Sequence, residues 1–267
     1  MISVGMSTSC LFPLPPERAF DVAARLGYDG VEVMVTNDAR TQDPDALLGW
    51  SQASGQPIVA IHAPVLLLTA FVWGRDPGVK LRRSAELAAA VGAGTVVVHP
   101  PFRWQGRYAV TFERLVGEVA GEFGLDVAVE NMFPWGLRGR SITAYAPSPD
   151  PTTLDVESMT LDFSHASLSG VDSLELARAM GPRLRHLHLC DGGGSMIDGK
   201  TADEHRLPGA GDQPVADVLR ELAASGWSGS VVAEVNTRKA RGFDARERML
   251  GETLAFAREH LDQRVHG

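Results

Sequence analysis

Short runs of hydrophobic residues alternate with helix-like stretches along the whole chain. Strands are predicted by eight runs rich in Val, Ile and Leu: residues 2–7, 31–35, 57–62, 95–99, 126–131, 159–162, 184–188 and 230–234. Apolar residues at helical spacing predict helices over residues 15–26, 43–54, 110–123, 172–180, 214–225 and 245–261, and one that ends near residue 92. Residues 132–155, rich in Pro, Gly and Ser, are expected to form a long loop with a degenerate helix.

This alternation of strands and helices is typical of parallel β/α units. Eight units favour an α/β fold with a closed (β/α)8 TIM barrel, and an open, doubly wound sheet is the alternative. The length of 267 residues suits one such barrel, so residues 1–267 are predicted to form a single domain.

Composition narrows the class of protein. The start of the chain lacks the basic region of a signal peptide, and the longest apolar run, residues 57–73, is interrupted and too short to cross a bilayer. The chain has only two cysteines, Cys10 and Cys190, and so no disulfide framework. We therefore expect a soluble cytoplasmic protein with no membrane contact. The net charge of −8 gives no support to nucleic-acid binding, although a few basic loops would suffice for it.

Six successive predicted strands end in a residue able to bind a metal: His62, His99, Glu130, Asp162, His188 and Glu234. In a barrel the carboxyl ends of all strands lie on one rim, where catalytic groups are built. The two-residue period of a strand turns these side chains inward with small or apolar neighbours below them, such as Ala128 below Glu130. Each carboxylate taken singly is more simply a helix cap or an ion-pair partner. Six in succession favour a functional site at the rim.

Three buried carboxylates in one place are unfavourable unless a cation compensates them. Oxygen-rich sites with one imidazole suit Mn²⁺, Mg²⁺ or Zn²⁺, and the residues expected to form such a site are Glu130, Asp162, His188 and Glu234. The glycine-rich stretch after the seventh strand supplies Asp203 and His205, which we expect to close over His188 from a loop. The simpler alternative is a strand end followed by polar loop residues. His186, one layer below His188, is expected to be a core or supporting residue.

Short motifs in a fixed order resemble the xylose-isomerase-like TIM-barrel superfamily. They occupy residues 26–32, 61–64, 98–100, 129–131, 161–165, 186–191, 207–211 and 232–234. This superfamily holds sugar isomerases and epimerases, dehydratases and the endonuclease IV group of DNA-repair enzymes (the AP endonuclease 2 family). The resemblance therefore implies a metal-dependent enzyme and leaves two classes of reaction open.

The first class is a sugar or sugar-phosphate isomerase or epimerase of carbohydrate metabolism. The resemblance implies one divalent metal per chain, with Glu130 and Glu234 both binding it and acting as acid and base through a metal-stabilised enediolate. Residues expected to contact a sugar or polyol substrate are Glu32, His165, His205 and Arg206. Such an enzyme is compatible with a homo-oligomer.

The second class is an endonuclease IV-like phosphodiesterase with up to three zinc ions, acting on abasic DNA. The resemblance implies that its additional ligands would be His62, His99, His165, Asp203 and His205. A third possibility is a barrel that keeps a metal only for stability. The acidic charge favours a small substrate, and aromatic residues that follow rim strands could roof its pocket or simply pack in loops: Trp73, Phe102, Trp104, Phe133 and Trp135.

Overall fold

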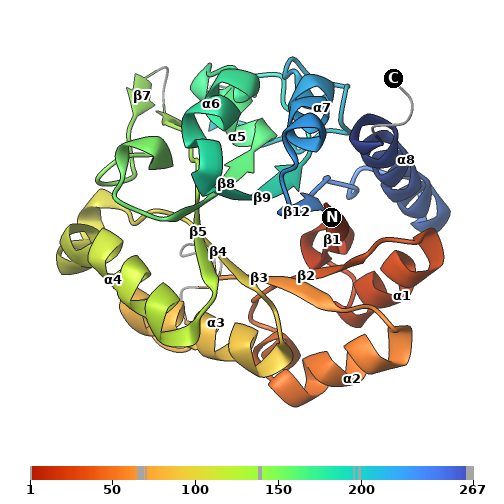
Figure 1. Ribbon diagram of the computed structural model, residues 1–267, viewed down its shortest axis with the longest axis horizontal. Coiled ribbons are helices and arrows are strands. Elements are labelled where there is room, and N and C mark those ends of the chain that lie inside the picture. The colour runs from red at the N-terminus through yellow and green to blue at the C-terminus, as the bar shows by residue number, and fades with distance from the viewer. Residues whose placement is uncertain are drawn as a thin grey trace.

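A closed barrel of parallel strands forms the centre of the molecule (Figure 1). The computed structural model describes residues 2–64, 69, 71–137, 140–194, 196–197 and 200–262. The barrel strands, in chain order, are β1 (Ser3–Ser7), β2 (Gly30–Met34), β3 (Ile58–His62), β4 (Thr95–Val98), β5 (Asp126–Glu130), β8 (Ser158–Asp162), β9 (Leu184–Leu189) and β12 (Ser230–Ala233). Each strand pairs in parallel with its neighbours, and β1 pairs with both β2 and β12, which closes the ring. The predicted (β/α)8 barrel is confirmed, and the open-sheet alternative is wrong.

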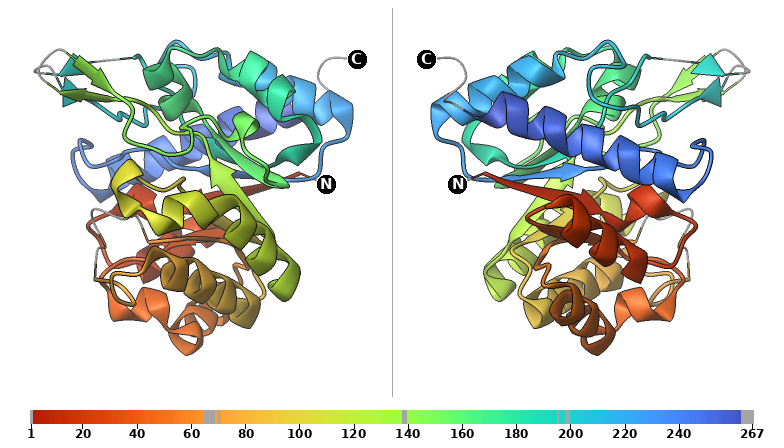
Figure 2. Two further views of the ribbon diagram at one scale, coloured as in Figure 1. Left: turned by 90° about the vertical axis from the view of Figure 1, so that its left-hand side faces the viewer. Right: turned by 90° about the vertical axis from the view of Figure 1, so that its right-hand side faces the viewer.

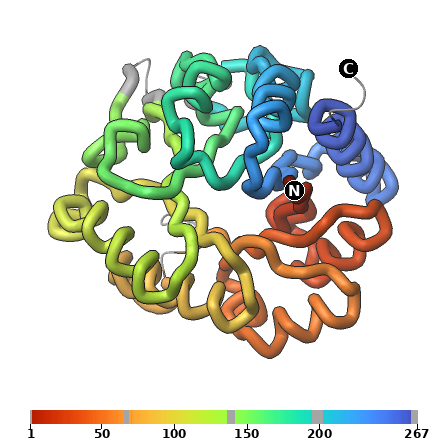
Figure 3. Tube along the Cα trace, viewed as in Figure 1, coloured from red at the N-terminus to blue at the C-terminus, as the bar shows by residue number. Residues whose placement is uncertain are grey.

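Helices cover the outside of the barrel, and the chain passes around it once, so that its first and last segments lie side by side (Figure 3). The helices are α1 (Glu17–Leu26), α2 (Pro44–Ser54), α3 (Pro77–Val91), α4 (Arg107–Phe123), α5 (Phe163–Ser169), α6 (Ser173–Met180), α7 (Val215–Ser225) and α8 (Phe243–Leu261). Because the strands are covered on both faces, most of their residues are buried, and all four residues of β4, Thr-Val-Val-Val, are buried.

Aspartate side chains begin several of these helices by accepting hydrogen bonds from free backbone N–H groups. Asp43, Asp76 and Asp172 cap α2, α3 and α6 in this way. Asp162, the last residue of β8, caps α5 by accepting a 2.7 Å hydrogen bond from the His165 backbone N–H. The helix-cap interpretation of Asp162 is therefore correct, and it coexists with a place in the rim site.

The structure differs from the sequence prediction mainly in the connections. His99 and Glu234 each lie one residue beyond their strand, α4 begins three residues before residue 110, and α5 was not predicted. The loop of residues 132–155 contains the hairpin β6 (Trp135–Leu137) and β7 (Arg140–Ile142) and a single 3₁₀ turn (Pro151–Thr153) rather than a degenerate helix. A three-residue strand has too few positions for a two-residue period to be visible in the sequence.

A second hairpin, β10 (Met196–Ile197) and β11 (Lys200–Thr201), lies beside β6 (Figure 2). Both hairpins project together from one corner of the molecule, on connections that follow β5 and β9. Within the described part of the chain, no helix is long and apolar enough to cross a membrane.

Candidate metal centre

The side chains predicted at the strand ends converge at one end of the barrel. Four of them, here called the inner group, each offer a ligand atom, and these atoms all lie within 4.8 Å of one another: Glu130, Asp162, His188 and Glu234. They come from β5, β8, β9 and the residue after β12, which are adjacent in the barrel. The prediction that these four side chains lie together is confirmed; their binding of a metal stays a prediction.

Nδ1 of His188 lies at the centre of the inner group. It is 3.2 Å from Glu130 Oε1, 3.0 Å from Glu234 Oε2 and 3.7 Å from Asp162 Oδ2. His188 and Asp162 are fully buried, and Glu130 and Glu234 are nearly so. One imidazole nitrogen therefore faces three carboxylates in a place from which water is largely excluded.

The charges within the inner group are compatible with a cation-binding site. Burial alone would raise the pKa of the Glu130 carboxyl, but the surrounding imidazoles, first His188, hold it well below its usual range. Burial alone would lower the pKa of His188, but the surrounding carboxylates, first Glu234, raise it well above its usual value. Glu130 Oε2 is buried and accepts no aligned hydrogen bond from the described residues. An ionised, under-coordinated carboxylate oxygen among two further carboxylates fits a divalent cation.

Five further side chains, here called the outer group, surround the inner one: His62, His99, His165, Asp203 and His205. Nε2 of His62 and of His99 lie 3.5 Å and 3.0 Å from Glu130 Oε2. Nε2 of His165 and of His205 lie 3.3 Å and 3.0 Å from Asp203 Oδ2. The structure thus brings together every additional ligand that the sequence suggested.

Three imidazoles of the outer group are oriented by backbone carbonyls. Nδ1 lies 2.9 Å from the Ala63 carbonyl in His62, 2.9 Å from the Asn131 carbonyl in His165 and 2.7 Å from the Glu234 carbonyl in His205. A hydrogen bond from Nδ1–H leaves Nε2 free to face the carboxylates, which is how metal-binding histidines are commonly held. His205 also adopts a positive φ of 43°, a strained conformation for a non-glycine residue.

Asp191 holds the loop that carries Asp203 and His205. Its buried carboxylate accepts hydrogen bonds from four backbone N–H groups, those of Gly192, Gly209, Gly211 and Gln213. A Cβ at Gly211 would lie 2.0 Å from the Gly192 carbonyl oxygen, so only glycine allows this close approach. The Pro208–Gly211 motif therefore anchors the loop to the end of β9. Asp191 and the glycines are visible in the sequence as parts of short motifs, but we did not predict from them that Asp191 anchors the loop.

Supporting contacts from distant segments were also missed. Ser9 Oγ, in the 3₁₀ turn Thr8–Leu11 that follows β1, donates a 3.0 Å hydrogen bond to Glu234 Oε1. Ser164 Oγ donates a 2.7 Å hydrogen bond to Asp203 Oδ1. A serine in a loop carries no sequence signal for such a contact. These bonds fix carboxylates that would otherwise rotate.

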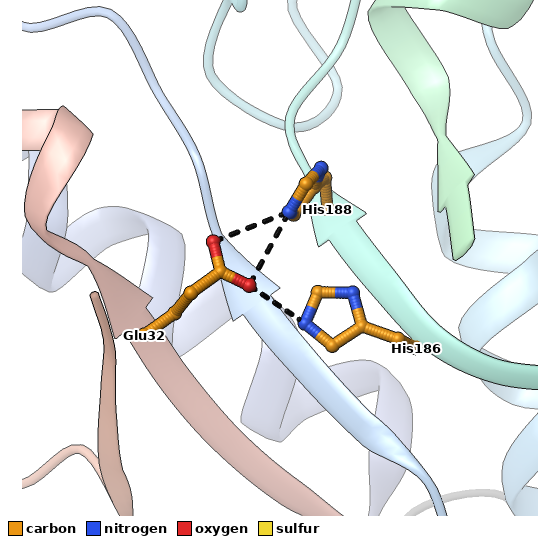
Figure 4. A group of neighbouring side chains, drawn as sticks. All are labelled: Glu32, His186 and His188. Carbon is orange, nitrogen blue, oxygen red and sulfur yellow. Dashed lines mark hydrogen bonds and ion pairs between the residues drawn. The ribbon is translucent and has the colours of Figure 1, made fainter. Parts of the chain in front are cut away.

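Glu32 lies beneath the rim, inside the barrel. Its carboxylate is fully buried between the imidazoles of His186 and His188 (Figure 4). Burial alone would raise the pKa of Glu32, but the two imidazoles, first His188, hold it well below its usual range. We expected Glu32 to line the substrate pocket; the structure places it under His188 instead, because the β2 side chain points across the barrel interior.

A cavity of about 650 Å³ opens beside the inner group. Glu234, His205 and Asp203 line it together with further polar residues such as Asn236 and Arg238, and its apolar lining residues include Phe12 and Leu14. His205 was predicted to contact substrate, and its position in the cavity lining is compatible with that role. The contact itself stays a prediction.

The other predicted substrate contacts do not line this cavity. His165 is buried against Asp203, with its ring 4.8 Å from that of Phe133. The Arg206 guanidinium lies against Gly193 and forms an ion pair with Glu204 (2.8 Å). Contact of either residue with substrate stays a prediction.

Three of the loop aromatic residues, Phe102, Trp104 and Trp135, form a cluster with Tyr145, whereas Trp73 packs against the main core. Phe102 stacks on Trp104 with ring centroids 4.5 Å apart and on Tyr145 at 5.0 Å, and Trp135 packs at its edge. Trp104 is 61% exposed, and none of these rings lines the cavity. Loop packing, rather than a roof over the cavity, is what the structure shows for them.

Comparison with known proteins agrees with the fold. The family model described as xylose isomerase-like TIM barrel matches residues 20–260. An uncharacterized protein of Mycobacterium tuberculosis is 48% identical over 279 residues, which cover 97% of this chain and 98% of that protein.

More distant similarities are to epimerases. Fructoselysine 3-epimerase of Escherichia coli O157:H7 is 24% identical over 289 residues, covering 98% of this chain and 97% of that enzyme. The crystal structure of a D-psicose 3-epimerase, determined in the presence of D-fructose, superimposes with a TM-score of 0.68 at 15% identity and covers 97% of this chain and 99% of that one. The structural likeness at this identity concerns the fold alone.

Proposed function

The chain belongs to the xylose isomerase-like TIM barrel family, and from that premise we propose that it is a divalent-metal-dependent isomerase or epimerase of a sugar, a sugar phosphate or a related polyol. The inner group is the observation that carries this proposal, because it gathers three carboxylates and one imidazole within 4.8 Å of one another. Glu234 of this group lines the adjoining cavity, which has room for a small molecule.

The residues that would hold the cation are Glu130, Asp162, His188 and Glu234. This donor set suits Mn²⁺, Mg²⁺ or Zn²⁺, with one ion per chain. When bound, such an ion supplies a Lewis acid that stabilises negative charge on substrate oxygens.

The two glutamates of the inner group are the acid–base residues of the proposal. Glu234 lines the cavity and accepts a hydrogen bond from Ser9 Oγ, and both observations support a role in which Glu234 removes a proton from a substrate carbon. Glu130 is 1% exposed and enclosed by imidazoles, so it meets a substrate only at the inner end of the site. Glu130 would return the proton from there. His205 and Asp203, which also line the cavity, would bind substrate hydroxyl groups.

The similar epimerases support this class of substrate. One relative carries the name fructoselysine 3-epimerase, and two solved structures with the same fold are named D-psicose 3-epimerase and D-allulose 3-epimerase. We therefore propose ketoses and their substituted or phosphorylated derivatives as the substrates to examine first.

The experiment is a proton-exchange assay in D₂O with protein purified without a chelating tag. Elemental analysis should find one Mn, Mg or Zn per chain. Ketoses and their derivatives are then incubated with the protein, and mass spectrometry is used to look for deuterium at carbon, which reports proton transfer even before a product is identified. Matched samples treated with a chelator should incorporate none. Metal-loaded protein that exchanges no proton in any such substrate would contradict the proposal.

A second candidate is a multi-zinc phosphodiesterase acting on abasic DNA. The observation that favours it is the convergence of the whole outer group on the inner one, which provides ligands for up to three ions. The net charge of −8 counts against it. Two or three zinc ions per chain, together with incision of an abasic duplex that His62→Ala and His99→Ala abolish, would establish this candidate in place of the first.

A further inference from the structure

A chain of polar contacts leads from the inner group down into the barrel. His186 and His188 lie two residues apart on β9 and face the interior together, and Glu32 reaches them from β2 (Figure 4). Strands β1 and β12 separate β2 from β9 in the barrel, so Glu32 crosses the interior to make this contact. All three side chains are fully buried.

The distances place the Glu32 carboxylate between the two rings. Nε2 of His188 lies 3.2 Å from Glu32 Oε1 and 3.4 Å from Oε2. Nε2 of His186 lies 2.9 Å from Oε2. Neither ring nitrogen of His186 makes an aligned hydrogen bond to the described residues, and the 2.9 Å approach of Nε2 to Glu32 Oε2 is an ion-pair contact.

His188 is held differently from the imidazoles around it. His62 and His205 each direct Nδ1 at a neutral backbone carbonyl, and Nδ1 of His165 lies 2.9 Å from the Asn131 carbonyl and 3.1 Å from Glu130 Oε1. In all three rings Nε2 faces a carboxylate. His188 is turned the other way: its Nδ1 faces the three carboxylates of the inner group, and its Nε2 faces a fourth carboxylate. A hydrogen bond to an ionised acceptor is shorter and about twice as strong as one to a neutral carbonyl.

This contact decides which ring nitrogen of His188 is free. When Nε2–H donates to Glu32, the lone pair lies on Nδ1, which is the nitrogen that faces Glu130, Asp162 and Glu234. A carboxylate behind a ligating imidazole also makes the ring a stronger ligand. Loss of the carboxylate would allow the other tautomer, in which Nδ1 carries the proton and is unable to bind a cation.

We propose that Glu32, supported by His186, is a positioning residue that holds His188 as an Nδ1 ligand and so sets the affinity of the inner group for a divalent cation. The role rests on the proposed function only in requiring that the inner group bind a metal. Glu32 and His186 touch neither substrate nor cation in this role. The same three side chains also lie close enough to hold an ion themselves, and the experiment separates that arrangement from the positioning role.

The experiment compares metal affinity in the full-length wild-type protein and in Glu32→Gln, which keeps the shape of the side chain and removes its charge. Chelator-stripped protein is titrated with Mn²⁺ and with Zn²⁺ against a fluorescent competitor. We expect Glu32→Gln to bind either ion about 10- to 100-fold more weakly with unchanged stoichiometry. Glu221→Gln, which alters an exposed glutamate paired with Arg178, is the matched control and should bind as the wild type does.

Nuclear magnetic resonance supplies a readout that a merely structural role would not change. In Zn²⁺-loaded, ¹⁵N-histidine-labelled protein, His188 should be neutral and protonated at Nε2, and Glu32→Gln should show a mixture of tautomers. His186→Gln leaves Glu32 in place, and we expect it to weaken binding by less than Glu32→Gln does. It also keeps the test available if Glu32→Gln fails to fold.

Each outcome has one meaning. Wild-type protein that binds neither ion would contradict the proposed function itself. If the wild type binds a metal and both variants match it in affinity and in the His188 tautomer, the positioning role is wrong. Loss of one whole equivalent of metal in Glu32→Gln, with the remaining affinity unchanged, would instead show that Glu32, His186 and His188 bind an ion directly.

Discussion

The inner group, whose Glu234 lines the cavity, and the pair Asp203–His205, which lines it too, are held in different ways. Glu130 and Asp162 end β5 and β8, His188 is the last residue but one of β9, and Glu234 directly follows β12. All four strands are hydrogen-bonded to a neighbouring strand on both sides. Asp203 and His205 lie on a loop that depends on the carboxylate of Asp191 for its attachment. The Asp203 side chain is 34% exposed, whereas that of Asp162 is fully buried.

The inner group is fixed by the barrel strands, whereas the pair Asp203–His205 lies on a loop that can vary. A closed barrel cannot move one strand end without disturbing its neighbours, so the inner group has a rigid geometry suited to an ion. A loop is free to differ in length and sequence without disturbing the barrel, so the pair Asp203–His205 is better suited to select a substrate. Variants should therefore affect the two regions unequally.

The largest effect is expected from the inner group. Glu234→Gln and Glu130→Gln should each lower kcat by about 10²- to 10⁴-fold, because each change removes an acid–base group and a charged ligand. Steady-state kinetics measures the loss, and circular dichroism should show an unchanged fold. Full activity in either variant would remove that glutamate from the mechanism.

Removal of the metal tests the inner group as a whole. Dialysis against a chelator should abolish turnover and lower thermal stability, since an ion at 100 times its Kd stabilises the folded state by about 2.7 kcal/mol. Calorimetry of the stripped and reloaded protein measures both the shift and its reversal. If reloading with metal restores thermal stability but no activity is found, the metal would serve only the stability of the barrel.

Proton release should accompany metal binding. In the metal-free protein the carboxylates, first Glu234, raise the pKa of His188 well above its usual value, so the ring is protonated near neutral pH. A cation must displace that proton, and its affinity should therefore rise as pH increases and fall as pH decreases. Isothermal titration in buffers of different ionisation enthalpy counts the protons released. A pH-independent affinity would contradict this expectation.

A smaller effect is expected from the loop pair. Asp203→Asn should reduce kcat/KM by about 10- to 100-fold while leaving one metal per chain, because His205 loses the partner that raises its pKa to about 10. Elemental analysis measures the metal content of the variant, and steady-state kinetics measures its kcat/KM. Loss of metal equivalents in this variant would mean that Asp203 binds an ion and that the multi-zinc candidate is correct.

The smallest effect is expected at Ser9, which touches the site through one hydrogen bond. Ser9→Ala removes the bond to Glu234 Oε1 and should lower kcat by about tenfold, since a bond to a charged group contributes about 1.5–3 kcal/mol when fully formed. The metal affinity should stay within a few-fold of the wild type. A rate equal to that of the wild type would show that Glu234 needs no such orientation.

Much of this site was predictable because it depends on periodicity. Glu130, Asp162 and His188 are the final inward-facing residues of strands whose hydrophobic pattern is plain in the sequence, and parallel strands in a barrel end on one rim. Their grouping therefore follows from the fold class. The hairpin β6–β7 and the short helix α5 could not be predicted, because their hydrophobic patterns are too short to show a period.

The sequence by itself determined the barrel, the order of the strand ends and the types of side chain gathered there. Only the tertiary structure decided which of those side chains touch. Glu32 meets His188 across 156 positions of sequence, and Ser9 meets Glu234 across 225. Such contacts depend on how the closed barrel brings distant strands together and on the direction of each side chain. Neither of these can be predicted from a local sequence pattern. For that reason Glu32 was expected to contact substrate and is found beneath the inner group.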